Sequence, residues 1–292
     1  MTRVAYQGVV GAYSQQAARQ RFGPEAETVP QPTFADVFRS VEIGDCDYGM
    51  LPVENSVAGS VNQSYELLVE HDLRIFAEVI LRVRHMLLAP TGTTRESIRV
   101  VRSHPQALAQ CRRYIACLGL EPQAAADTAG AAHDLVRSPE AGVAVIASEA
   151  AAGLTGLEIL DRGIEDAPTN FTRFFVLSRE DAPRAQRSKT SLVFTTPHQP
   201  GALHDCLGEF ASRKVSLSKI ESRPRPNRPW QYLFYLDFEG HCRDPKCEAA
   251  LLGLLLRSSF VKMLGSYPAA MTPIGPESLE AAPETHAIEV TQ

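Results

Sequence analysis

The sequence lacks the charge pattern of a protein that binds nucleic acid or an acidic membrane surface. Its 292 residues include 29 Lys and Arg against 34 Asp and Glu, which gives a formal net charge of -5 and a pI of about 5.9. It also lacks a block of like charges that could serve as an interaction tail. Nucleic acids and anionic surfaces select a basic footprint. We therefore expect neither as a partner, and predict small molecules and further copies of the chain instead.

Long hydrophobic runs and closely spaced cysteine pairs are missing as well. The first residues lead directly into a short apolar segment, without the hydrophobic core of a signal peptide or the length of a membrane span. The 6 cysteines are scattered, as is usual for free thiols in a reducing compartment, and they do not form two ligand pairs at zinc spacing. We expect a cytoplasmic protein without a metal site.

What is present is a chain of short apolar segments that alternate with amphipathic ones. Hydrophobic residues make up 44% of the sequence, which is enough for the cores of two domains. The alternation predicts an α/β fold. The apolar segment at residues 74–89 exceeds the usual length of one strand, and we expect it to cross between two lobes. Other strands are predicted at residues 4–7, 48–53, 98–102 and 143–146.

Several polar residues fall where predicted strands end and helices begin. In α/β sheets these points meet at one crevice, towards which helix N-termini also point. A hydroxyl residue at such a point is usually a structural N-cap. Taken together, however, the set predicts a cleft rich in neutral donors with one cation, suited to a small carboxylate ligand. Its members are Ser14, Asn55, Ser56, Ser103, Gln106, Thr128, Ser148, Thr172 and Arg173.

The segment at residues 169–177 is predicted to be a strand that is entered through a polar turn. Alternation along a strand places Thr172 and Phe174 on one face and Arg173 and Phe175 on the other. By itself, an Arg in such a strand is typical of a solvated edge.

A second pattern follows a polar break at residues 182–188, which we interpret as a linker. From residue 189 to 267 the predicted elements follow the order βαββαβ, the ferredoxin-like arrangement. Residues 268–292 offer few apolar side chains for burial and are predicted to form a disordered tail.

At this point the residues resemble a known family, the prephenate dehydratases with a C-terminal ACT regulatory domain. The resemblance implies a two-lobed catalytic domain at residues 1–181, similar in layout to periplasmic binding proteins, and an ACT domain at 189–267. One lobe would comprise residues 1–80 and 168–181, and the other residues 81–167. The matching motifs are residues 6–14, Pro52-Val53-Glu54-Asn55-Ser56 with Gly59, residues 103–108, residues 127–132 and Asn170-Phe171-Thr172-Arg173-Phe174.

The resemblance also implies an activity, the conversion of prephenate to phenylpyruvate, water and carbon dioxide in phenylalanine biosynthesis, without a cofactor. Thr172 would be the essential residue that donates a hydrogen bond to the departing hydroxyl, next to Arg173 and Phe174 of the same motif. We hypothesise that Arg173 or the capped helix ends hold the pyruvyl carboxylate. The substrate-binding residues would be Ser14, Asn55, Ser56, Ser103, Gln106 and Thr128.

Two segments of the C-terminal half resemble those that bind phenylalanine at a subunit interface in this family. The resemblance implies allosteric regulation by phenylalanine and self-association as a dimer or tetramer. The first loop departs from the usual family pattern and resembles the arogenate-using branch, so arogenate stays an alternative substrate. A non-catalytic aromatic amino-acid sensor is a further alternative, which the intact motif at Thr172 disfavours. The two effector segments are Gly201-Ala202-Leu203-His204 and Glu221-Ser222-Arg223-Pro224.

Overall fold

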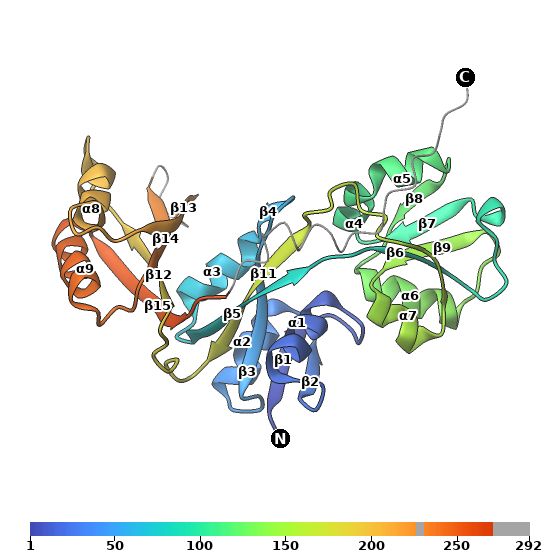
Figure 1. Cartoon of the computed structure of the whole chain (residues 1–292), viewed down its shortest axis with the longest axis horizontal. Helices are drawn as coiled ribbons and strands as arrows, with labels where there is room; N and C mark the ends of the chain where they lie inside the picture. The colour runs from blue at the N-terminus through green and yellow to red at the C-terminus, as the bar shows by residue number, and fades with distance from the viewer. Residues whose placement is uncertain (226–230, 271–292) are drawn as a thin grey trace.

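The β-sheets that the structure describes lie side by side along the long axis of the molecule (Figure 1). The structure, a computed structural model, describes residues 1–225 and 231–270. Its α/β composition agrees with the alternation seen in the sequence. Within these residues, none of the helices combines the length and the apolar character needed to cross a membrane.

The first sheet combines parallel strands from the N-terminal part with a strand that returns much later in the chain. Its order is β2 (Glu27–Gln31), β1 (Arg3–Gln7), β3 (Tyr48–Asn55), β11 (Phe171–Ser178) and β5 (Arg74–Arg82), with β4 (Gly59–Ser60) paired to β3. Strand β11 runs antiparallel to both neighbours, β3 and β5. Helix α1 (Tyr13–Phe22) covers one face, and α2 (Phe34–Glu42) and α3 (Asn62–Glu70) cover the other.

The predicted alternation along β11 is confirmed by its packing. Phe174 belongs to the core under α1, whereas Phe175 belongs to the core under α2 and α3. The predicted crossing at residues 74–89 is also confirmed, because β5 ends at Arg82 and β6 (Met86–Ala89) begins in a different sheet.

The second sheet has the order β10 (Glu158–Arg162), β6, β9 (Val143–Ala147), β7 (Val100–Ser103) and β8 (Glu121–Ala124). It is joined to the first sheet by the two connections at residues 83–85 and 163–170. Both connections pass the polar cluster described below. The accompanying helices are η1 (Arg95–Ser97), α4 (Pro105–Gln110), α5 (Arg112–Cys117), α6 (Thr128–Arg137) and α7 (Glu149–Thr155).

The C-terminal unit has the βαββαβ order that the sequence predicts. Its elements are β12 (Ser188–Thr195), α8 (Ala202–Ala211), β13 (Leu217–Pro224), β14 (Tyr232–Glu239), α9 (Pro245–Arg257) and β15 (Phe260–Pro268). They form an antiparallel sheet of order β13-β14-β12-β15. Pro268 pairs with Ser188, and the backbone N–H of Ala270 donates to Glu78 Oε1 at 2.9 Å. The folded part therefore continues past the predicted boundary at 267, and the rest of the predicted tail lies outside the described residues.

The C-terminal unit shares a hydrophobic core with the first sheet. Leu264 and Tyr267 of β15 are buried in the same cluster as Phe175 and Leu177 of β11. Gly265 makes this approach possible, because a Cβ atom there would lie 2.5 Å from the carbonyl oxygen of Ile75, and its φ of +153° is one that other residues rarely adopt.

We predict that Gly265→Ala destabilises the protein by about 1–3 kcal/mol, because the added methyl group forces β15 away from β5. Chemical denaturation measures this change. Gly153→Ala in α7 is the matched control, since nothing lies within 4 Å of the added Cβ. That control is expected to be neutral or stabilising by up to about 1 kcal/mol. Equal denaturation midpoints for Gly265→Ala and the wild type would contradict the tight contact.

Candidate active site

A hydroxyl and an amide meet where β11 lies against β3. Thr172 is paired with Asn55 in the strand register, and Asn55 Nδ2 donates to Thr172 Oγ1 at 3.0 Å. The same nitrogen also donates to Asn170 Oδ1 at 2.8 Å. Asn55 and Asn170 are buried. The residues around the predicted catalytic threonine thus form a network of neutral side chains.

The backbone decides the orientation of the Asn55 amide. Asn55 Oδ1 accepts from the N–H groups of Val57 at 3.1 Å and Ala58 at 2.9 Å. A backbone N–H can only donate, so the oxygen must lie on that side and the nitrogen must face Thr172. Since Thr172 Oγ1 accepts this hydrogen bond, its own hydroxyl hydrogen stays available for another acceptor.

The second lobe contributes Gln110, the last residue of α4. Its Nε2 donates to Asn55 Oδ1 at 3.2 Å, while its Oε1 accepts from Asn170 Nδ2 at 3.0 Å. The same Oε1 lies 2.9 Å from His85 Nε2. Because Oε1 is an acceptor, the proton of a neutral His85 must be on Nε2, and Nδ1 is then an acceptor. The Tyr13 hydroxyl has one hydrogen to share between Nδ1, 2.9 Å away, and Arg84 O, 2.8 Å away.

Burial keeps this network neutral. Desolvation lowers the pKa of His85, an effect that the hydrogen bond to Gln110 and the charge of Glu165 only partly oppose. Desolvation also raises the pKa of Tyr13 well above its ordinary value, and Glu165 adds to this shift. His85 lies in one connection between the sheets and Asn170 in the other. The network therefore sits at the junction of the two lobes.

The other predicted substrate-binding residues are not brought into this network. Ser56 lies next to it, where its Oγ donates to Thr169 O at 2.7 Å and accepts from the N–H of Phe171 at 2.9 Å. Ser103 is buried and donates to Ile146 O at 2.6 Å, so its hydroxyl holds two strands together. Gln106 is exposed.

Most of the predicted N-caps also lie elsewhere. Ser14 is a buried residue inside α1, whose N-cap is Ala12. His104 caps α4 in place of Ser103. Thr128 is the first residue of α6, and Asp127 caps that helix. Ser148 does cap α7, and its Oγ also donates to Gly11 O at 2.8 Å, which joins the first loop to the second lobe.

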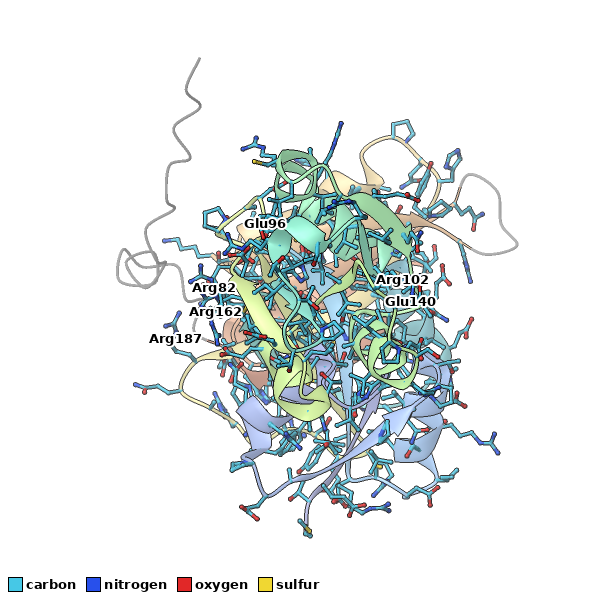
Figure 2. All side chains as sticks on the ribbon, turned by 90° about the vertical axis from the view of Figure 1, so that its right-hand side faces the viewer. Arg82, Glu96, Arg102, Glu140, Arg162 and Arg187 are labelled. Atoms are coloured by element: carbon cyan, nitrogen blue, oxygen red, sulfur yellow. The ribbon has the colours of Figure 1, made fainter. Side chains whose placement is uncertain are left out.

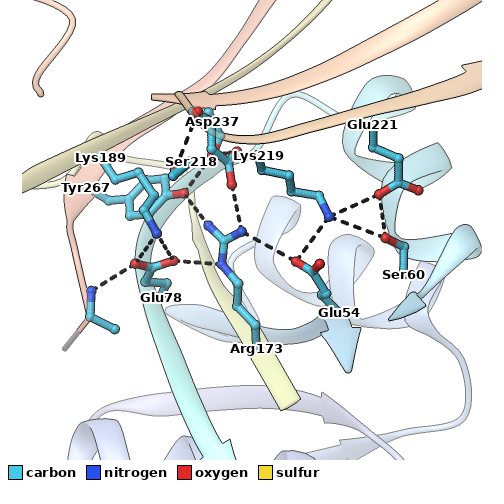
Figure 3. A network of polar contacts seen from close by, with 12 residues as sticks. Glu54, Ser60, Glu78, Arg173, Lys189, Ser218, Lys219, Glu221, Asp237 and Tyr267 are labelled. Atoms are coloured by element: carbon cyan, nitrogen blue, oxygen red, sulfur yellow. Dashed lines mark hydrogen bonds and ion pairs between the residues drawn. The ribbon is translucent and has the colours of Figure 1, made fainter. Parts of the chain in front are cut away.

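Arg173 lies on the opposite face of the sheet from Thr172. Its Nε donates to Glu78 Oε2 at 2.7 Å, its Nη1 to Asp237 Oδ2 at 2.6 Å and its Nη2 to the Tyr267 hydroxyl at 3.0 Å (Figure 3). This placement contradicts the hypothesis that Arg173 holds a substrate carboxylate, because the guanidinium group is directed into the C-terminal unit. Phe174 is buried in the core under α1.

No pattern in the sequence assigned Tyr13, His85, Gln110 or Asn170 to the site. A signal existed for Gln110, which is spaced three residues from the buried Ala107 and therefore lies on the inner face of α4. Asn170 is the first residue of the matching motif that contains Thr172. Tyr13 and His85 carried no comparable signal, because their contact depends on how the two lobes meet.

The first predicted effector segment lines a cavity, and the second lies on β13, where Ser222 and Pro224 pair with the cavity residues Phe234 and Tyr232. The segment from Gly201 to His204 lines a cavity of about 410 Å³ at the start of α8. Among the described residues that line this cavity, none comes from the second segment. Glu221 and Arg223 instead point towards the first sheet, where the Arg223 guanidinium lies 5.0 Å from the centre of the Tyr65 ring. Ser222 and Pro224 are exposed on β13.

The lowered pKa of His85 leads to a prediction about acid sensitivity. The unfolded chain binds a proton near pH 6.5 and the folded chain does not, so this residue's contribution to the free energy of unfolding is present above pH 6.5 and is lost as the pH falls. We expect acidification from about pH 7.5 to about pH 5.5 to destabilise the wild type more than His85→Gln, by up to about 1.4 kcal/mol, because only one pH unit of this range lies below 6.5.

Urea denaturation at both pH values measures this difference. The exposed His198 provides the control, because His198→Gln is expected to leave the acid sensitivity unchanged. The same acid-induced loss in the wild type and in His85→Gln would show that His85 is not held neutral.

Comparisons with known proteins agree with the motifs around this site. Residues 4–182 match the family model described as prephenate dehydratase. A relative from Arabidopsis thaliana, arogenate dehydratase/prephenate dehydratase 1, chloroplastic, is 44% identical over 282 residues, which cover 91% of this chain and 72% of the relative.

Solved structures are similar to this chain over almost its whole length. A prephenate dehydratase from Arthrobacter aurescens in complex with L-Phe is 32% identical, with a TM-score of 0.84 and 93% of each chain covered. A protein described as a novel type of quorum quenching acylase is 39% identical, with a TM-score of 0.84 over 92% of this chain and 98% of that one. The extent of the family match and the identity to these relatives show that this chain belongs to the prephenate dehydratase family.

Proposed function

We propose that the chain converts prephenate to phenylpyruvate in phenylalanine biosynthesis, with Thr172 as the group that acts on the departing hydroxyl. The observation that carries this proposal is the hydrogen bond from Asn55 Nδ2, which leaves the Thr172 hydroxyl free to donate. The family membership supports the same reaction.

The chemistry fits a site made of neutral donors. When the ring carboxylate leaves as carbon dioxide, its bonding electrons move through the ring, the ring becomes aromatic and the C–O bond breaks. The oxygen leaves as water after taking up one proton, which solvent must ultimately supply. A threonine is too weak an acid to give up its proton unaided, so Thr172 stabilises the developing charge by a hydrogen bond.

The position of Arg173 also suits this reaction. A cation beside the ring carboxylate would stabilise the charge that has to disappear in the transition state, and would raise the barrier. The guanidinium group is instead held on the far side of the sheet by Glu78 and Asp237. We infer that Arg173 acts on the position of its strand and does not contact the substrate.

The C-terminal unit is proposed to be an ACT domain that senses phenylalanine between two chains. The relative from Arthrobacter aurescens binds L-Phe. In this chain, residues 201–204 line a cavity, and residues 221–224 are not among its lining residues. We propose that a second copy of the chain brings the two segments together at the interface. Self-association as a dimer or tetramer and a cytoplasmic location remain predictions.

Arogenate is the second candidate substrate. It differs from prephenate by an ammonium group in place of a keto oxygen. The first loop, with Ala12 before Tyr13 and Ser14, resembles the arogenate-using branch, and the Arabidopsis relative carries both activities in its name. Assays of the purified protein with each substrate, with and without L-Phe, decide between them.

The first functional prediction concerns Thr172. Thr172→Ala removes the donor and is expected to lower kcat by about 100-fold or more, as loss of a transition-state hydrogen-bond donor does in other enzymes. Thr172→Ser keeps the hydroxyl and should retain most of the activity. Phenylpyruvate formation measures both. Full activity in Thr172→Ala would remove Thr172 from the mechanism.

The second functional prediction separates the glutamine found in the structure from the one expected from the sequence. Gln110→Glu replaces the donor to Asn55 Oδ1 by an acceptor, so it should disorder the Asn55 amide and lower kcat by about 10-fold to 100-fold. Gln106→Glu makes the same chemical change at an exposed position and should leave kcat within about twofold. A larger loss in Gln106→Glu than in Gln110→Glu would contradict the assignment.

A further inference from the structure

The candidate site lies on one face of β3 and β11, and the opposite face of these strands contacts the C-terminal unit. Thr172 is paired with Asn55, and the next pair along the strands is Arg173 with Glu54. Because side chains alternate across a sheet, the first pair faces the amide network and the second faces β13 and β14 (Figure 3). Each site residue is therefore one peptide bond from a charge that contacts the other domain.

The contact of Arg173 is buried and strongly charged. Its side chain is 13% exposed, and those of Glu78 and Asp237 are 0% and 6% exposed. Lys189 Nζ lies 2.8 Å from Glu78 Oε1. The two carboxylates are therefore balanced by two cations, Arg173 and Lys189. Burial alone would lower the pKa of Arg173, but the neighbouring Tyr267, Asp237 and Glu78 raise it above its ordinary value. The interaction energy between charges that water does not reach changes strongly with distance. Moving Arg173 away from Glu78 and Asp237 therefore costs free energy.

Glu54 forms the second contact. Its Oε2 lies 3.1 Å from Lys219 Nζ on β13, and Lys219 also lies 3.1 Å from Glu221 Oε2. Glu221 in turn accepts from the hydroxyl of Ser60 on β4. Burial would raise the pKa of Glu221, but the hydrogen bonds from Ser60 and Lys219 lower it below its ordinary value. Through Lys219 and Glu221, strand β13 therefore contacts both β3 and β4.

The backbone at this point is able to respond. The register between β11 and β3 shifts directly after Arg173, because Phe174 pairs with Pro52 and leaves Val53 as the extra residue of a bulge. Bulges interrupt the ladder and re-aim nearby side chains. A small displacement of Glu54 or Arg173 can therefore change the distance between Asn55 and Thr172.

We propose that Glu54 and Arg173 are positioning residues through which β13 and β14 of the C-terminal unit set the arrangement of Asn55 and Thr172. A movement of that unit, including one caused by an effector, would then alter turnover without any contact with the substrate. This proposal rests on the dehydratase function proposed above, and its test separates the two.

The test compares Glu54→Gln and Lys219→Met with a matched control at the same interface. Lys262 also joins the C-terminal unit to the first sheet, since its Nζ donates to Val69 O at 2.9 Å and to His71 O at 2.6 Å. These acceptors lie at the C-terminal end of α3, and neither residue pairs with the site strands β3 and β11. Lys262→Met therefore removes an interdomain cation without disturbing the proposed link.

We expect Glu54→Gln and Lys219→Met each to lower kcat by about 3-fold to 30-fold with a much smaller change in KM. The double variant should fall by less than the product of the two, because both act through one contact. In the single variants L-Phe should still bind, as measured by calorimetry, but should change kcat less than in the wild type. Lys262→Met should resemble the wild type in all three measurements.

Hydrogen exchange followed by mass spectrometry provides a readout that does not depend on turnover. Glu54→Gln should speed exchange in the peptides of β3 and β11, and Lys262→Met should not. Unchanged kcat and exchange in Glu54→Gln would overturn the proposal, as would an equal loss of kcat in Lys262→Met. If the wild type converts neither prephenate nor arogenate, the proposed function fails and the exchange data alone decide on the link.

Discussion

The pairing of β3 with β11 is the constraint on which the rest of the structure depends. These strands are far apart in the chain, and their register brings Asn55 opposite Thr172 and Glu54 opposite Arg173. A slip of one residue would exchange the two faces and would place charges in the amide network. The same register therefore builds the candidate site and the domain contact.

The separation of neutral and charged groups has a chemical consequence. On one face, amides, an imidazole and hydroxyls satisfy one another and leave the Thr172 hydroxyl available to the substrate. On the other face, buried charges are balanced in pairs, as burial requires. The sheet keeps the strongest cation of the motif, Arg173, away from a carboxylate that has to leave.

The C-terminal unit is part of the same folded body as the first sheet. Tyr267 and Leu264 complete the core under β11, and Gly265 lets β15 approach the backbone of β5 closely. By contrast, ion pairs such as Arg102 with Glu140 lie on the surface of the second lobe, as Figure 2 shows, where solvent weakens them. The buried contacts at the domain interface are therefore the ones that can transmit a displacement.

The sequence alone determined the α/β alternation, the crossing near residue 82, the βαββαβ order of the C-terminal unit and the alternation of Thr172 and Arg173, because these depend on local periodicity. The motifs also identified the family. Only the tertiary structure showed that Gln110 joins Asn55 and Thr172 in one network and that Tyr13, His85 and Asn170 complete it. The tertiary structure also showed that the Arg173 side chain contacts Glu78 and Asp237. These contacts join residues from different sheets. Local sequence periodicity predicts which residues share a face of a strand, but it does not predict which distant residues that face contacts.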